Sequence, residues 1–208
     1  MERIPVRPDR AEGRVIEQAV ARLRAGAVMA YPAEALYGLG VDIRQTAAVA
    51  RLIKLKGRPA GKPISVVVSD REMLEKWVRV PQPAEPLIAA YWPGPLTLIL
   101  PARPLVPPVL LGSGSGLGIR VPGVELLREL CRVLGAPITA TSANLSGGAE
   151  PRTSEQVARA LGHGLDLLLD AGPLPEAKAS TVLDLSGEEP RLIREGAVTR
   201  GMLAPYLN

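Results

Sequence analysis

Apolar and polar positions form two kinds of pattern along the chain. Apolar residues recur at the spacing of a helix in some segments, and short apolar runs bounded by Gly or Pro separate these segments. The helical spacing predicts helices at residues 16–23, 47–54, 71–77, 85–91, 126–134, 154–161 and 199–207. The short runs predict strands at 27–31, 64–68, 96–100, 119–121, 167–170, 181–185 and 191–194, and a further strand that begins at Pro137. Because the two kinds of segment alternate without an internal repeat, we expect one layered α/β domain with a mixed sheet.

A basic segment, Leu55–Pro63, lies between a predicted helix and a predicted strand. It carries three cations and two glycines in nine residues, and the cations are Lys56, Arg58 and Lys62. Glycine lets a ligand approach the backbone, Arg offers a planar fork that matches phosphate, and Lys offers a point charge. The segment therefore favours anion binding, with a solvated surface turn as the alternative. It is not a Walker loop, because only three residues separate Gly57 from Gly61 and Pro63 replaces the Ser or Thr.

Three other segments carry residues of the kind that bind ligands. Glu34 lies between a strand end and a predicted tight turn at Gly38-Leu39-Gly40, a place where α/β folds hold ligand groups. Arg120 lies in a short apolar strand, where its charge is costly unless an anion or an acceptor meets it. The segment Thr141–Gly147 is rich in hydroxyls and amides, which suit either a ligand-binding loop or an ordinary turn.

Composition excludes several classes of site. The chain has 208 residues, 47% of them hydrophobic, and a formal net charge of +4, which permits a polyanionic partner without requiring one. The single Cys131 excludes an internal disulfide and a cysteine-cluster metal site, and the single His163 excludes a multi-histidine site. No apolar run approaches the length of a membrane span and the N-terminus lacks a signal-peptide core, so we expect a cytoplasmic protein with no membrane contact.

Four ordered segments together resemble the threonylcarbamoyl-AMP synthase family, the YrdC-like proteins. They are Tyr31–Gly40, Lys56–Pro59, Ile119–Pro122 and Thr141–Gly147. Ser180–Asp184 and Ile193–Gly196 fit the C-terminal pattern of the family, and the resemblance spans about residues 15–198. The C-terminal domain of the long members has no counterpart, so the resemblance implies the short form, a single YrdC-like domain over residues 1–208.

The resemblance implies a fold and a reaction. The fold is a three-layer domain with a twisted mixed sheet of about seven strands, helices on both faces and a concave basic cavity. The reaction joins L-threonine, bicarbonate and ATP into threonylcarbamoyl-AMP and pyrophosphate, for the N6-threonylcarbamoyl modification of adenosine at tRNA position 37. The implied partners are these three substrates, a contact with tRNA and the proteins that transfer the threonylcarbamoyl group. Mg²⁺ is expected with the triphosphate and no metal site made of protein ligands is expected.

The resemblance also implies residue roles. Lys56 and Arg58 would be the catalytic contacts to the triphosphate. The ATP-binding set would be Lys56, Arg58, Lys62, Ser142, Asn144 and Arg194. The threonine-binding set would be Arg120, as the clamp on the carboxylate, with Ala140 and Ser180.

The sequence departs from the family pattern at four positions. Ala33 replaces a usual Thr beside the amino-acid pocket, and Lys62 replaces a frequent Asn. Val67 stands where some members have His, and Gly116 where a Thr can occur. The loss of the hydroxyl at position 33 leaves selectivity for threonine open.

Two alternatives keep the fold and change the function. One is a module that binds double-stranded RNA or tRNA without synthase activity, although aromatic residues make up only 3% of the chain and offer few stacking platforms. The other is the carbamoyl-handling domain of hydrogenase maturation factors, which occurs within longer chains that also contain zinc-finger and acylphosphatase parts.

Overall fold

Ten strands form one mixed sheet in the computed structural model, which describes residues 1–207. The strands are β1 (Glu2–Pro5), β2 (Met29–Pro32), β3 (Tyr37–Gly40), β4 (Ser65–Val67), β5 (Leu96–Pro101), β6 (Gly116–Arg120), β7 (Ile138–Ser142), β8 (Leu167–Asp170), β9 (Thr181–Asp184) and β10 (Arg191–Arg194). Their order across the sheet is β1-β8-β2-β3-β7-β4-β6-β5-β9-β10. The helices are α1 (Gly13–Arg24), α2 (Thr46–Lys56), α3 (Arg71–Trp77), α4 (Glu85–Tyr91), α5 (Pro108–Leu111), α6 (Glu125–Leu134), α7 (Ser154–Leu161) and α8 (Arg200–Leu203).

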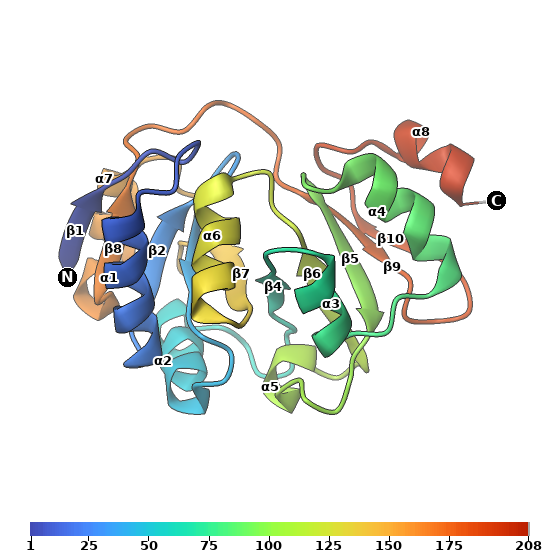
Figure 1. Ribbon diagram of the computed structural model, residues 1–208, viewed down its shortest axis with the longest axis horizontal. Coiled ribbons are helices and arrows are strands. Elements are labelled where there is room, and N and C mark those ends of the chain that lie inside the picture. The colour runs from blue at the N-terminus through green and yellow to red at the C-terminus, as the bar shows by residue number, and fades with distance from the viewer. Residues whose placement is uncertain (208) are drawn as a thin grey trace.

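The sheet combines parallel and antiparallel pairs, as the sequence predicts. β2 pairs antiparallel with β3 and parallel with β8, and β4 pairs parallel with β6 and antiparallel with β7. Helices α1, α6, α3 and α4 lie along one face of the sheet in Figure 1, and α1 packs beside α6. Apolar side chains from these elements form one continuous core. None of the helices that the structure describes is long and apolar enough to cross a bilayer.

The sheet has ten strands where about seven were expected. One extra strand is β1, an edge strand that pairs with β8 and in which alternate residues are half-buried and exposed. Its four residues, Glu2–Pro5, offer no apolar run, so the pattern of the sequence does not reveal it.

The segment Gly38-Leu39-Gly40 belongs to a strand, and the prediction of a tight turn there is wrong. The ring of Tyr31 lies across this strand, and its hydroxyl donates to the carbonyl of Thr139 at 2.9 Å. A Cβ at position 38 would lie 2.7 Å from Tyr31 Cε2, and one at position 40 would lie 2.8 Å from Cε1. The two glycines therefore make room for a buried aromatic ring.

The ends of two helices have recognisable caps. Thr153 and Gln156 form the capping box at the start of α7, because Thr153 Oγ1 accepts from the N–H of Gln156 while Gln156 Oε1 accepts from the N–H of Thr153. Helix α2 ends at Lys56 and is capped by Gly57, whose φ of 55° is the left-handed conformation that glycine adopts without strain. That turn delivers the chain into the basic segment.

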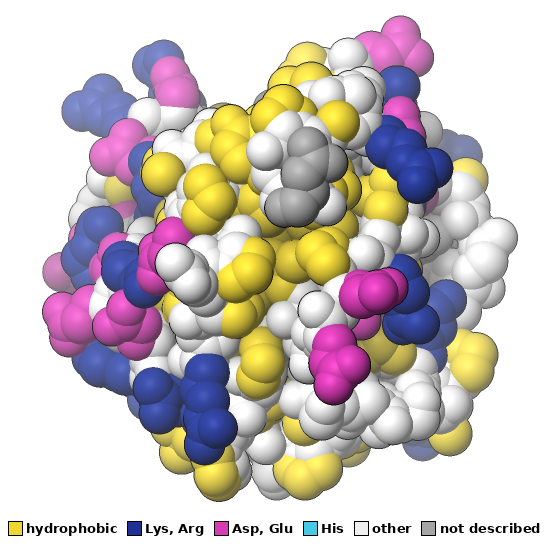
Figure 2. All heavy atoms as spheres, turned by 90° about the vertical axis from the view of Figure 1, so that its right-hand side faces the viewer, with side chains coloured by type: hydrophobic (Ala, Val, Ile, Leu, Met, Phe, Trp, Pro, Cys, Tyr) yellow, Lys and Arg dark blue, Asp and Glu magenta, His cyan; other side chains and the backbone are white. Residues whose placement is uncertain are grey.

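The closing helix predicted at residues 199–207 is confirmed only in its first half, because the α-helix is a single short turn. Helix α8 ends at Leu203, and a 3₁₀ turn follows at Ala204–Tyr206, where Pro205 lacks the N–H that a continued helix would use. Tyr91 on α4 meets Tyr206 edge to face, and its hydroxyl donates to the carbonyl of Met202 at 2.8 Å. Figure 2 views this edge of the molecule, where apolar side chains gather around the C-terminal segment.

Thr139 generates a prediction about stability. Its buried hydroxyl donates to the carbonyl of Leu39 and accepts from the N–H of Val41, both at 3.1 Å, so it stitches β7 to β3. Thr139→Val keeps the shape and removes both bonds, and we expect it to lower the free energy of unfolding by about 1–3 kcal/mol. Chemical denaturation measures this, with Thr46→Val at an exposed position as the control. Equal losses in the two variants would contradict the prediction.

Candidate functional site

One cavity of about 440 Å³ brings together every site residue predicted from the sequence. The nine residues are Lys56, Arg58, Lys62, Arg120, Ala140, Ser142, Asn144, Ser180 and Arg194. They come from the last residue of α2, the α2–β4 loop, strand β7, the ends of β6 and β10, the loop after β7 and the residue before β9. These segments are far apart in the sequence and meet because their strands are neighbours in the middle and on one side of the sheet.

The cavity is strongly positive. Its lining within residues 1–207 contains six cations against two carboxylates. The cations are Lys56, Arg58, Lys62, Arg120, Lys178 and Arg194, and the carboxylates are Glu34 and Glu150. A concave wall with this excess of charge raises the local concentration of anionic ligands.

Lys56 is the most buried of these cations, with 2% of its surface exposed. Its Nζ donates to the carbonyl oxygens of Ser142 and Asn144 and, at 3.2 Å, to Asn144 Oδ1. Burial, together with the charges of Arg58 and Lys62, lowers the pKa of Lys56 to about 8. Lys56 therefore fastens the end of α2 to the end of β7 and the loop after it, and it places a positive charge at the wall of the cavity.

Asn144 organises the loop that follows β7. Its Oδ1 accepts from the hydroxyl of Ser142 at 2.6 Å, and its Nδ2 donates to the carbonyl of Gly148 at 2.6 Å. Because Lys56 bonds the same amide oxygen, the three side chains form one connected group. The hydroxyl of Ser142 is thereby held at the wall of the cavity.

Arg58 folds back onto its own loop. Its Nε donates to the carbonyl of Lys62 at 3.3 Å, and its Nη2 donates to the carbonyl of Pro63. Burial lowers the pKa of Arg58, but a guanidinium stays charged at any pH at which the protein is folded. The loop thus carries a fixed positive charge at the wall of the cavity.

Arg120 is 9% exposed, and it forms an ion pair with Glu34. The sequence singles out Glu34 by its position but does not indicate a role for it. Nη1 of Arg120 donates to Glu34 Oε1 at 2.8 Å and lies 3.5 Å from the carbonyl of Gly94. The N–H of Gly123 donates to the same Glu34 oxygen at 2.9 Å. The acceptor that a buried arginine requires is therefore Glu34.

Ser180 and Arg194 are in direct contact, although the resemblance assigns them to different substrates. Arg194 donates from Nε and Nη2 to the carbonyl of Ser180, at 3.2 and 2.8 Å, and from Nη2 to its hydroxyl at 3.3 Å. Thr97, which also lines the cavity, donates to the same hydroxyl at 3.0 Å. Thr97 was missed because a threonine in an apolar strand reads as ordinary β structure.

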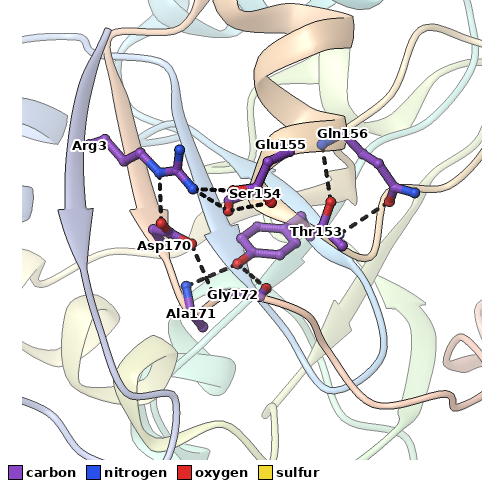
Figure 3. Close-up of polar contacts among 9 residues, drawn as sticks. Arg3, Thr153, Ser154, Glu155, Gln156, Asp170, Ala171 and Gly172 are labelled. Carbon is purple, nitrogen blue, oxygen red and sulfur yellow. Dashed lines mark hydrogen bonds and ion pairs between the residues drawn. The ribbon is translucent and has the colours of Figure 1, made fainter.

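Tyr37, another lining residue that the sequence did not single out, is fixed from outside the cavity. Its hydroxyl donates to the carbonyl of Gly172 at 2.8 Å and accepts from the N–H of Ala171 at 2.9 Å. Beside these residues, Arg3 binds Asp170 and Glu155, each at 2.6 Å (Figure 3). Edge strand β1 and the start of α7 thus brace the segment that holds Tyr37.

The described residues offer no ready metal cage. Within residues 1–207, no three or more His, Cys, Asp or Glu side chains lie together in a way that could hold a metal ion. Of the two carboxylates in the cavity wall, Glu34 is engaged with Arg120.

The chain matches a known protein family. The family model Sua5_yciO_yrdC, described as "Telomere recombination", matches residues 21–196. The chain belongs to this family. A threonylcarbamoyl-AMP synthase of Stenotrophomonas maltophilia is 42% identical over 176 residues, which are 83% of this chain and 95% of that protein. This Sua5/YciO/YrdC member therefore matches a relative of nearly its own length.

Longer members of the family match equally well. The threonylcarbamoyl-AMP synthase of Bacillus subtilis is 40% identical over 188 residues, covering 89% of this chain but only 54% of that protein. The crystal structure of Pyrococcus abyssi Sua5 complexed with L-threonine superposes with a TM-score of 0.94 at 34% identity, covering 100% of this chain and 61% of that one. The chain thus spans a little over half the length of these two relatives.

The buried lysine generates a prediction about pH. We expect the affinity for sulfate, whose charge is constant near neutral pH, to fall as pH rises through about 8, where Lys56 loses its proton. Loss of one charge contact of ~1 kcal/mol corresponds to a fall of about fivefold. Calorimetric titration at several pH values measures this. Lys56→Met should remove the inflection, and exposed Lys178→Met should keep it. An unchanged inflection in Lys56→Met would refute the assignment.

Proposed function

We propose that this protein is a threonylcarbamoyl-AMP synthase, a nucleotidyltransferase that makes threonylcarbamoyl-AMP and pyrophosphate from L-threonine, bicarbonate and ATP. One observation carries the proposal. Lys56, Arg58 and Lys62, which suit phosphates, line the same cavity as Arg120, whose guanidinium suits a carboxylate. The names of the relatives, and the L-threonine in the Pyrococcus abyssi structure, support the choice of substrates.

The chemistry needs positioning and charge more than a side-chain nucleophile. The threonine amine captures bicarbonate with loss of water and gives a carbamate. A carbamate oxygen then attacks the α-phosphorus of ATP, the bond to the β-phosphate oxygen breaks, and pyrophosphate leaves. Fixed cations around the phosphates stabilise the charge that develops in this step, and the walls of the cavity align the two reactants.

The lining residues divide into two sets in this proposal. Lys56, Arg58 and Lys62 face the triphosphate, while Ser142, Asn144 and Arg194 hold the nucleotide. Arg120, Ala140 and Ser180 face threonine. Because the protons of Lys56 are engaged by the loop after β7, its contribution is the charge it supplies and the Ser142 hydroxyl it helps to hold.

Mg²⁺ would enter this site with ATP. Glu150 is the one carboxylate of the lining, among the described residues, that is not paired with Arg120. Phosphate oxygens and water would therefore supply most of the ligands, as is usual for Mg²⁺ bound to a nucleotide. The product would pass to proteins that transfer the threonylcarbamoyl group to tRNA. All residues assigned to the activity here lie within residues 21–196, the part of the chain that the family model matches.

Pyrophosphate release tests the proposal. With ATP, Mg²⁺ and bicarbonate, we expect release with L-threonine, less with L-serine and none without an amino acid. Arg58→Ala should abolish release, because it removes a fixed charge from the phosphate region. Arg159→Ala, on the outer part of α7, serves as the charge control and should retain activity. Salt-dependent binding of RNA without any pyrophosphate release would favour the RNA-binding alternative instead.

Arg120 can be tested separately from the phosphate set, which is Lys56, Arg58 and Lys62. Arg120→Lys keeps the charge and loses the planar fork, so a bidentate contact to a carboxylate becomes a single one. We expect the KM for threonine to rise about tenfold, the equivalent of ~1.4 kcal/mol, with little change in the KM for ATP. Steady-state kinetics with each substrate varied in turn measures this. A rise confined to the KM for ATP would show that Arg120 serves the nucleotide.

A further inference from the structure

We propose that Glu34 binds the ammonium group of the amino acid that enters this cavity. The inference rests on the function proposed above and adds a specificity-determining residue to it. Glu34 and Arg120 would act together, as an anion and a cation that match the two charges of a zwitterion.

The geometry leaves one oxygen of Glu34 available. Oε1 accepts from both Arg120 Nη1 and the N–H of Gly123, at 2.8 and 2.9 Å. In the part of the chain that the structure describes, no side-chain donor reaches Oε2. The side chain keeps 27% of its surface exposed, against 11% for Arg120, and both residues line the cavity. The remaining carboxylate oxygen is therefore accessible to a ligand.

Arg120 is only partly occupied by this ion pair. Its Nη1 takes both protein acceptors, Glu34 Oε1 and the carbonyl of Gly94. The rest of the guanidinium fork can receive a carboxylate, while Glu34 lies at the Nη1 side of the same group. An α-amino acid carries its carboxylate and its ammonium on one carbon, so it can reach both residues at once.

Glu34 is ionised at neutral pH. Burial acts to raise the pKa of its carboxyl, but the charge of Arg120 and hydrogen bonds from backbone N–H groups outweigh burial and lower the pKa below its ordinary value. The second carboxylate of the lining, Glu150, is close enough to Lys56 to act on its charge, so it belongs with the phosphate set. Glu34 is thus the acceptor beside the carboxylate clamp.

Comparison of two ligands separates this role from mere support of Arg120. L-Threonine carries the ammonium group, and (R)-3-hydroxybutyrate is the same molecule with hydrogen in its place. Ligand-observed NMR reads weak binding of both, without ATP, to the full chain. In Glu34→Gln, which keeps the shape and the acceptor for Gly123, we expect threonine affinity to fall about tenfold or more while hydroxybutyrate affinity is unchanged.

Each other outcome has a definite meaning. Equal losses for both ligands would overturn the inference and make Glu34 a positioning residue for Arg120. Unchanged threonine affinity in Glu34→Gln would also overturn it. If the unaltered protein binds no threonine at all, the proposed function itself fails. Glu17→Gln makes the same charge change at an exposed position of α1, outside the cavity, and we expect it to leave threonine affinity within about twofold of the parent.

Discussion

A buried ammonium group holds the centre of this structure together. Lys56 is almost wholly withdrawn from water, and desolvation makes a bare charge there costly. The structure compensates with three oxygens from Ser142 and Asn144, so the helix end and the loop after β7 cannot separate without exposing an unpaired charge. The shape of the hollow and its positive potential therefore come from the same contact.

In the middle of the sheet, the absence of side chains on two glycines allows an aromatic ring to pack closely against the backbone. The glycines of β3 let the ring of Tyr31 lie flat against the strand, and its hydroxyl reaches the neighbouring strand β7. Ala140 and Ser142 of β7 lie at the wall of the cavity. Apolar packing of the helices supplies the stability on which these polar contacts depend.

Much of this arrangement could be predicted from the sequence, and the failures have physical reasons. Periodicity predicts most helices and strands, and the charged and hydroxyl residues that it places at strand ends do meet in one cavity. The strand β3 was taken for a turn because glycine signals flexibility locally, whereas here it accommodates Tyr31, a neighbour in space. The pairing of Glu34 with Arg120 spans 86 positions, and no local pattern encodes a contact of that separation.

The contact between Arg194 and Ser180 links two regions that would otherwise be independent. Arg194 donates to both the backbone carbonyl and the hydroxyl of Ser180, so a ligand that moved one side chain would also disturb the other. If Arg194 serves the nucleotide and Ser180 the amino acid, binding of one substrate that shifts this pair would alter the affinity for the other by the same factor, since linkage between two binding equilibria is reciprocal. Cooperativity between two small molecules would arise in this way within a single sheet, without hinge motion or a second subunit.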